Sequence, residues 1–127
     1  MIFTKPLRFN YEFSRVYNRG VFASGRHVVV HCFKRPRKLR HNLTPIPIDI
    51  NRTGFTGSRK IKGAVQRNRA RRLLRESYRL LEKDMITGLD LVIMMKYAHP
   101  LPAFREVDED LRKLLKRMHL LEEKTNG

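Results

Sequence analysis

Cysteine is nearly absent from this sequence: Cys32, inside an apolar run, is the only one among 127 residues. One cysteine cannot form an intramolecular disulfide, so we expect a reducing, cytoplasmic environment. No apolar stretch approaches the roughly 20 residues of a membrane-spanning helix, and the N-terminus lacks the apolar segment of a signal peptide. What remains is a chain of one domain's length that can bury a modest core.

Acidic residues are scarce in the first two-thirds of the chain. Through Leu81 there are 20 Lys and Arg residues against 3 acids (Glu12, Asp49 and Glu76), so the formal charge of +16 is concentrated there. Metal-assisted cleavage by protein side chains normally needs clustered carboxylates, which this spacing does not provide. The sequence also lacks a Walker loop and a nucleophile–base motif. We therefore predict a binding protein with no catalytic residue and no metal site of its own.

His27 and His31 are four residues apart, a spacing that would suit a shared metal ion on a helix. However, the side chains of residues 27–33 alternate, with Val29 and Phe33 on the histidine face, and this alternation predicts a strand. On a strand at about 3.3 Å per residue the two histidines stand roughly 13 Å apart. We therefore exclude a metal pair and expect His31 to face a binding cleft or solvent.

Cationic charge is abundant over residues 58–79, where nine Lys and Arg residues stand against Glu76 alone. From Ala64 onward the pattern has a helical period. At about 100° per residue, six polar residues fall within an arc of roughly 140°, which we call the arginine face. Its members are Arg67, Asn68, Arg71, Arg72, Arg75 and Arg79. The opposite side, predicted to face the core, consists of Ala70, Leu73, Leu74, Ser77 and Leu81.

A solvated charged surface is the ordinary interpretation of such a run. Solvated helix faces usually mix signs, because like charges four residues apart destabilise a helix. Here Arg67, Arg71 and Arg75 repeat at that spacing. Arginine also has a planar fork that binds phosphate oxygens in pairs. The pattern therefore favours polyanion binding, and nucleic acid is the obvious polyanion.

The spacing Arg67-Asn68-x-x-Arg71-Arg72-x-x-Arg75-Glu76-x-x-Arg79, preceded by Ser58-Arg59-Lys60 and Gly63, resembles the RNR motif of the bacterial ribonuclease P protein subunit. The resemblance extends from about Leu7 to Leu121. It implies a monomeric protein within a ribonucleoprotein, which helps remove the 5′ leader from precursor tRNA while a large RNA subunit performs the Mg²⁺-dependent hydrolysis. The residues that it assigns to RNA-subunit binding are Arg59, Lys60, Arg67, Asn68, Arg69, Arg71, Arg72, Arg75 and Arg79.

Aromatic residues gather on one side of a short helix predicted over residues 9–19. We expect Phe9 and Val16 of this side to be core, while periodicity leaves the places of Phe13 and Tyr17 open. The segment E-F-S-R-V-Y-N-R-G resembles the family pattern D-F-x-x-V-[FY]-x-x-G, whose two aromatics line the cleft for leader RNA. Aromatic faces suit that task because any base can stack on them. The leader-binding residues implied are Phe13, Tyr17, Val29, His31 and Thr56, which we call the aromatic surface.

The remaining segments complete an α+β order of α-β-β-β-α-β-α, a mixed sheet covered by helices. Residues 1–121 are expected to form one domain, with a long basic loop at 34–47 and a tail at 122–127. That loop is about ten residues longer than the family's usual connection, and composition assigns it no role beyond electrostatic attraction. The family fold resembles the second domain of ribosomal protein S5 and implies a left-handed βαβ crossover, although the general rule predicts the opposite hand.

The other predicted elements are an edge strand at 21–23, a strand through 51–58, a buried central strand at 89–97 and an amphipathic helix at 104–121. The small side chains of Gly54, Thr56 and Ser58 share one face. This face suits either the floor of a groove or a loose edge strand. Two other functions stay open from the residues alone: a ribosomal-type RNA-binding protein and an autonomous nuclease. The aromatic helix argues against the first, and the scarcity of carboxylates argues against the second.

Overall fold

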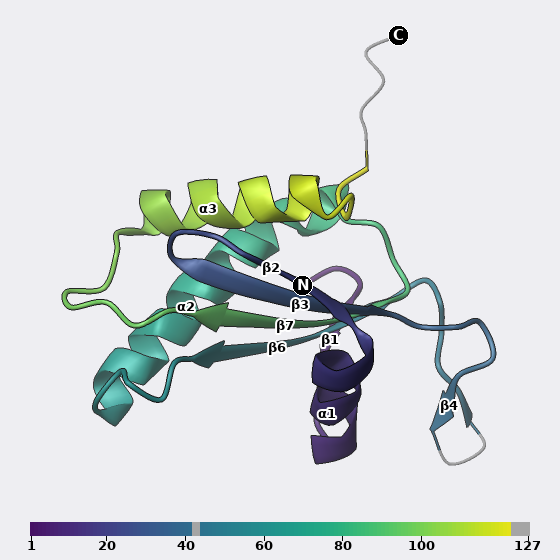
Figure 1. Ribbon diagram of the computed structural model, residues 1–127. Helices are drawn as coiled ribbons and strands as arrows, with labels where there is room; N and C mark the ends of the chain where they lie inside the picture. Colours follow the sequence, from purple (N-terminus) through teal and green to yellow (C-terminus); the bar gives the residue numbers. More distant parts are fainter. Residues whose placement is uncertain (42–43, 123–127) are drawn as a thin grey trace, which may run out of the picture.

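The computed structural model describes residues 1–41 and 44–122, and a five-stranded mixed sheet lies at its centre (Figure 1). In spatial order the strands are β1 (Thr4–Pro6), β6 (Asn51–Gly57), β7 (Leu89–Met95), β3 (Val28–Lys34) and β2 (Val21–Ser24). β1 and β7 run parallel to β6, whereas β3 runs antiparallel to β7 and β2. The predicted mixed sheet is confirmed.

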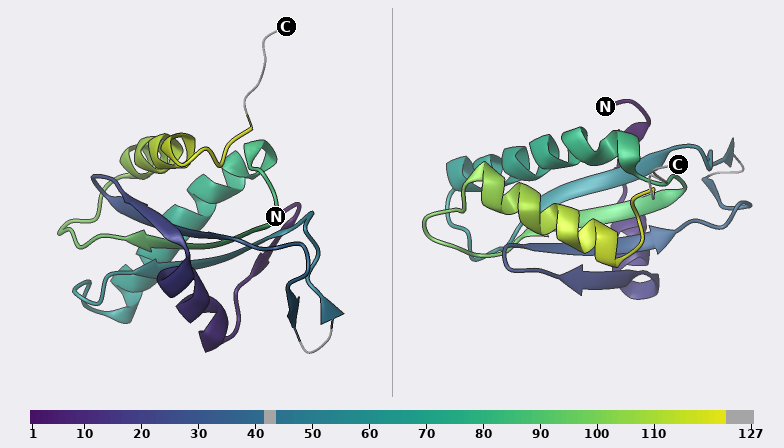
Figure 2. Two further views of the ribbon diagram at one scale, coloured as in Figure 1. Left: turned by 45° about the vertical axis from the view of Figure 1, so that its right-hand side comes forward. Right: turned by 90° about the horizontal axis from the view of Figure 1, so that it is seen from above.

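Three helices cover the two faces of this sheet. They are α1 (Asn10–Arg19), α2 (Ala64–Leu81) and α3 (Phe104–Arg117). α2 and α3 lie over one face, and α1 packs on the opposite face (Figures 1 and 2). α2 connects β6 to β7, which are parallel neighbours, and is therefore the crossover helix of a βαβ unit.

The main hydrophobic core lies between the sheet and the α2–α3 pair. Leu74 of α2, Leu111 of α3 and Ile93 of β7 are fully buried members of one cluster. Val92 points to the opposite face and joins a smaller cluster with Val16 of α1. β7 is thus buried on both faces, as its apolar run predicts, because helices cover it from either side.

The last helix ends earlier than the sequence predicts, at Arg117 instead of Leu121. His119 adopts the left-handed conformation at φ 59°, and the Leu120 N–H donates to the Leu115 carbonyl at 2.9 Å. This hydrogen bond closes the helix end and turns the chain away. The inward residues were predicted correctly: Val107, Leu111, Leu114 and Leu115 are buried, and Met118 is partly buried.

β1 was not predicted. The Glu82 carboxylate, in the 3₁₀ turn η1 (Glu82–Asp84), accepts hydrogen bonds from the N–H groups of Ile2 at 2.6 Å and Phe3 at 3.2 Å. Thr4 then pairs with Asn51 of β6. A three-residue strand carries no readable periodicity, so only its distant partners reveal it.

The start of α1 is closed by a side chain of its own first turn. Phe9 is the N-cap, and the Glu12 side chain accepts the backbone N–H groups of Arg8 and Phe9 at 3.0 and 2.9 Å. The expectation that Phe9 is core is wrong: its side chain lies outside the first turn and is 46% exposed. Leu7 occupies the buried position instead.

The predicted basic loop contains short structure of its own. Two-residue strands β4 (Arg40–His41) and β5 (Thr44–Pro45) pair as a small antiparallel ladder. Arg35 is buried at its base, where its guanidinium donates to the carbonyls of Pro47 and Ile50 at 2.7 and 2.8 Å. Residues 42–43 of this loop, and 123–127 of the predicted tail, lie outside the described residues.

Candidate RNA-binding surfaces

α2 separates its two sides as its periodicity predicts. Ala70, Leu74 and Ser77 are fully buried and Leu81 is nearly so. The buried polar groups are satisfied: the Ser77 hydroxyl donates to the Asp108 carboxylate of α3 at 2.8 Å, and the Tyr78 hydroxyl lies 2.9 Å from the Thr4 hydroxyl. Every member of the arginine face is therefore exposed.

The arginine face contains one acidic partner. Arg79 binds Glu76 through Nε at 3.1 Å and through an NH₂ nitrogen at 2.6 Å, and this pair lowers the pKa of Glu76. Arg71 donates to the Asn68 side chain at 3.3 Å, which leaves its positive charge unneutralised. Arg75 lies 5.9 Å from the centre of the Phe55 ring. Four of the five guanidinium charges on this face thus have no acidic partner in the described chain.

Arg59, Lys60 and Arg69 do not lie on the arginine face. Arg59 and Lys60 are exposed in the loop before α2. Ile61 of the same loop is 3% exposed and packs in the core. Arg69 is two residues past Arg67, or about 200° around the helix. These three cations extend the positive surface around the N-terminal end of α2.

The aromatic surface lies on the α1 side of the sheet, opposite α2 and α3. The strand register places residues of neighbouring strands side by side in rows. In one row Val29 of β3 pairs with Met94 of β7, which pairs with Thr56 of β6. In the next row His31 is the partner of Val92, which is the partner of Gly54. α1 packs across β3 and β7 and adds the two aromatic residues.

Phe13 and Tyr17 have different environments. Phe13 is half-buried in the cluster of Val16 and Val92, and its ring covers Gly54, where an added Cβ would lie 2.5 Å from a ring carbon. The predicted face of small side chains at Gly54, Thr56 and Ser58 is therefore covered by the Phe13 ring at Gly54. Tyr17 is 47% exposed and meets the His31 ring edge-on, with 4.8 Å between centroids.

Two residues near this surface were missed from the sequence. Met94 lies between Val29 and Thr56 in the central row, and Phe22 of β2 is 67% exposed with its ring 5.5 Å from that of His31. Burial lowers the pKa of His31. The alternation of β2 and β3 around their turn could have placed Phe22 beside His31. Met94 required the pairing of β7 with both neighbours.

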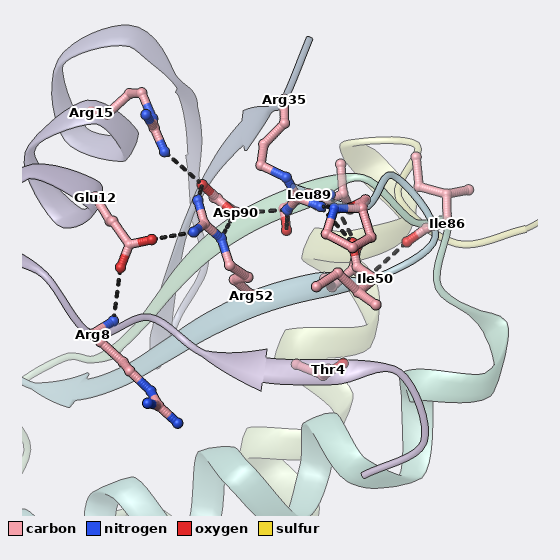
Figure 3. A network of polar contacts seen from close by, with 12 residues as sticks. Thr4, Arg8, Glu12, Arg15, Arg35, Ile50, Arg52, Ile86, Leu89 and Asp90 are labelled. Carbon is pink, nitrogen blue, oxygen red and sulfur yellow. Dashed lines mark hydrogen bonds and ion pairs between the residues drawn. The ribbon is translucent and has the colours of Figure 1, made fainter. Parts of the chain in front are cut away.

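Buried charges stand beneath α1 beside the aromatic surface (Figure 3). Asp90, fully buried, accepts from Arg35 at 2.8 Å, from Arg52 at 2.6 Å and from Arg15 at 3.4 Å. Arg52 also pairs with Glu12 of α1. The two carboxylates thus hold α1, β6, β7 and the base of the long loop together.

This charge cluster was missed because Asp90 interrupts an apolar run only once. Its two carboxylates are occupied by guanidiniums, and within residues 1–41 and 44–122 no three His, Cys, Asp or Glu side chains are placed to hold a metal ion. No helix of the described chain is long and apolar enough to cross a membrane.

A mixed sheet with an arginine-rich crossover helix on one face and exposed aromatic rings on the other defines a small basic RNA-binding protein. A family model described as Ribonuclease P matches residues 3–119. The chain belongs to the ribonuclease P protein family, as the RNA-binding subunit that acts in tRNA 5′ processing. The ribosomal-type alternative finds no support in these matches.

Named relatives and solved structures are similar over most of the chain. The ribonuclease P protein component of Pelotomaculum thermopropionicum is 39% identical over 90% of this chain and 92% of its own. That of Caldanaerobacter subterraneus subsp. tengcongensis is 35% identical, covering 89% and 88%. The RNase P protein of Thermotoga maritima superposes with a TM-score of 0.72 at 26% identity, over 89% of this chain and 96% of that one.

Proposed function

We propose that this protein divides its RNA contacts between two surfaces. The arginine face, extended by Arg59, Lys60 and Arg69, binds the ribonuclease P RNA, and the aromatic surface receives the 5′ leader of precursor tRNA. The observation that carries this proposal is the row of four exposed guanidiniums that have no acidic partner in the described chain, because bound phosphates would relieve the repulsion between these like charges.

The leader contact is proposed from the exposed rings. Tyr17, His31 and Phe22 form a row of touching rings, with Val29, Met94 and Thr56 beside it. Stacking on such rings is worth roughly 1–3 kcal/mol per base and depends little on base identity. This chemistry suits a leader whose sequence varies from one tRNA precursor to another.

The hydrolysis itself is assigned to the RNA subunit together with Mg²⁺. The carboxylates nearest the aromatic surface, Glu12 and Asp90, are already bound by arginines, and a metal ion would have to displace those guanidiniums. The protein's part is to hold the leader and to screen phosphate repulsion where substrate meets the RNA subunit.

A reducing cytoplasm suits the single cysteine. Cys32 is 2% exposed, and burial raises the pKa of its thiol to about 12, so the reactive thiolate is scarce at neutral pH. We propose that one copy of the protein works there within the ribonucleoprotein.

Cleavage of precursor tRNA tests the division of labour. The isolated protein should cleave nothing, and it should stimulate cleavage only when ribonuclease P RNA and Mg²⁺ are both present. Robust Mg²⁺-dependent cleavage by RNA-free protein, with a contaminating nuclease excluded, would contradict the proposal.

A further inference from the structure

A cavity of about 460 Å³ lies at the N-terminal end of α2, outside the arginine face and the aromatic surface. Its walls come from the loop after β6, the first turns of α2 and the loop after β7. These loops are adjacent because β6 and β7 end side by side, where the Ser58 N–H donates to the Met95 carbonyl at 2.9 Å. Figure 1 shows both loops at the end of the sheet where α2 begins.

The lining of the cavity combines two rings, those of Tyr97 and His99, with three cations. Tyr97 is 56% exposed, and its hydroxyl has no hydrogen-bond partner within the described chain. Lys60, Lys62 and Arg69 are exposed around it, and none of them has an acidic partner in residues 1–41 or 44–122. A ring for stacking beside cations for a phosphate is the chemistry that recognises a nucleotide.

Packing does not account for the place of Tyr97. Met95, two residues earlier, is fully buried and completes the core at this end of β7, while Ile61 seals the floor of the cavity at 3% exposure. The Tyr97 ring therefore lies beyond the core. An exposed ring beside cations that have no acidic partner in the described chain offers a nucleotide a stacking face together with a phosphate site.

The cavity lies on the side of the sheet that carries α2, because Gln66 and Arg69 line it. Met94, the residue of β7 nearest to this end that faces the aromatic surface, points the opposite way. A ligand in the cavity would thus continue the positive surface of α2, away from the row of Tyr17 and His31.

We propose that this cavity binds one unstacked nucleotide of the ribonuclease P RNA, with its base on Tyr97 and its phosphate among Lys60, Lys62 and Arg69. The inference rests on the proposed function, in which α2 binds the RNA subunit. It adds a contact to a base, whereas the arginine face binds phosphates.

Binding of purified ribonuclease P RNA to the full-length protein tests this inference. Tyr97→Ala should weaken RNA affinity about 5- to 140-fold, the equivalent of roughly 1–3 kcal/mol, without changing its salt dependence. Lys62→Ala should instead reduce the salt slope by about one counterion. Tyr97→Phe should bind like the wild type, because the ring and not the hydroxyl stacks. Tyr11→Ala, which removes an exposed tyrosine from α1, is the matched control and should have no effect on RNA-subunit binding.

Tyr97→Leu separates stacking from packing, since it keeps apolar bulk without an aromatic face. Wild-type RNA affinity in Tyr97→Leu, or in a Tyr97→Ala protein of unchanged melting temperature, would overturn the inference. So would a Tyr97→Ala defect confined to holoenzyme binding of substrates that carry a leader, because the nucleotide would then belong to the substrate. Arg67→Ala in the same assay reports on the proposed function separately: if it leaves affinity and salt slope unchanged, the arginine face is not the RNA contact.

Discussion

At the residue scale, neighbouring side chains of one motif differ in what they are free to bind. Tyr17 presents its ring to solvent, whereas Phe13 is held over Gly54 and helps to pack α1 on the sheet. Arg75 has no acidic partner within residues 1–41 and 44–122, whereas Arg79 is paired with Glu76. Periodicity does not distinguish Phe13 from Tyr17, and only their neighbours in the fold do so. Arg79 differs from Arg75 through a local contact, because Glu76 stands three residues before it.

Tyr17→Ala and Phe13→Ala should therefore behave differently. Tyr17→Ala should weaken holoenzyme affinity for precursor tRNA with a leader by about one stacking contact, roughly 1–3 kcal/mol, and leave the melting temperature unchanged. Phe13→Ala should also lower stability, by less than the roughly 3–5 kcal/mol of a fully buried Phe. Affinity for precursor and mature tRNA, measured with thermal melting, checks both. Equal losses of affinity for the two substrates in a destabilised Tyr17→Ala protein would mean that Tyr17 is a packing residue and not a leader contact.

Arg75→Ala and Arg79→Ala should differ in salt dependence. Loss of one phosphate contact at Arg75 should lower the slope of log affinity against log salt by about one. Arg79→Ala should change it less, because Arg79 is already paired with Glu76 and contributes less to binding a phosphate. Titration of the RNA subunit at several salt concentrations measures both slopes, and a larger change in Arg79→Ala would contradict this ranking.

At the element scale, short segments are held by polar contacts to distant parts of the chain. β1 depends on Glu82 at the end of α2, and α1 depends on Glu12, Arg52 and Asp90. The three acidic residues are buried, so removing a partner leaves an unsatisfied group behind.

The stability that the Glu82 carboxylate gives to β1 should depend on pH. Burial by itself raises the pKa of Glu82, but hydrogen bonds from Thr4, Ile2 and Phe3 outweigh it and leave the pKa below its usual value. Because the pKa of Glu82 is lower in the folded protein than in the unfolded chain, its carboxylate stabilises the fold at pH values above the ordinary Glu pKa. This stabilisation is lost as the pH falls through the folded-state pKa. Glu82→Gln should therefore lower the unfolding free energy at pH 7 by about 1–3 kcal/mol and flatten its decline in acid.

Denaturant unfolding at several pH values measures this effect. Glu109→Gln, which changes an exposed carboxylate of α3 paired only at the surface with Arg105, is the matched control and should leave the profile nearly unchanged. Parallel pH profiles for wild type and Glu82→Gln would show that Glu82 does not stabilise β1 as a carboxylate.

At the scale of the whole molecule, folding and RNA binding use opposite sides of the same helix. The buried side of α2 joins the core with α3 and β7, while the arginine face stays exposed. Like charges along that face oppose helix formation, and the buried side supplies the compensating stability.

Leu74→Ala and Arg67→Ala should separate these two tasks. Leu74→Ala should lower the unfolding free energy by about 2–5 kcal/mol, because it opens a cavity in a fully buried site, and should keep the salt slope of the folded protein. Arg67→Ala should keep the stability and reduce that slope by about one. Chemical denaturation and salt-dependent RNA binding report the two effects. An unfolded Arg67→Ala protein with an unchanged slope would mean that the faces of α2 are assigned wrongly.

The sequence by itself determined the elements whose burial follows a local period. The two sides of α2, the inward residues of α3 and the central position of β7 could be read from it, because hydrophobic spacing at 3.6 or 2 residues reports which side is buried. The RNR motif likewise indicated the family before any contact was known. The assignment of individual residues to RNA stays a prediction.

Only the tertiary structure decided the features built from residues far apart in the chain. The contact of Ile2 with Glu82 spans 80 positions and that of Arg52 with Asp90 spans 38, and no local pattern records either. For the same reason the positions of Phe22 and Met94 beside the aromatic surface were not predicted. Phe9 was wrongly predicted to be a core residue. Tyr97 shared a cavity with Lys60 and Arg69 because two parallel strands end side by side, which is decided by strand pairing and not by sequence spacing.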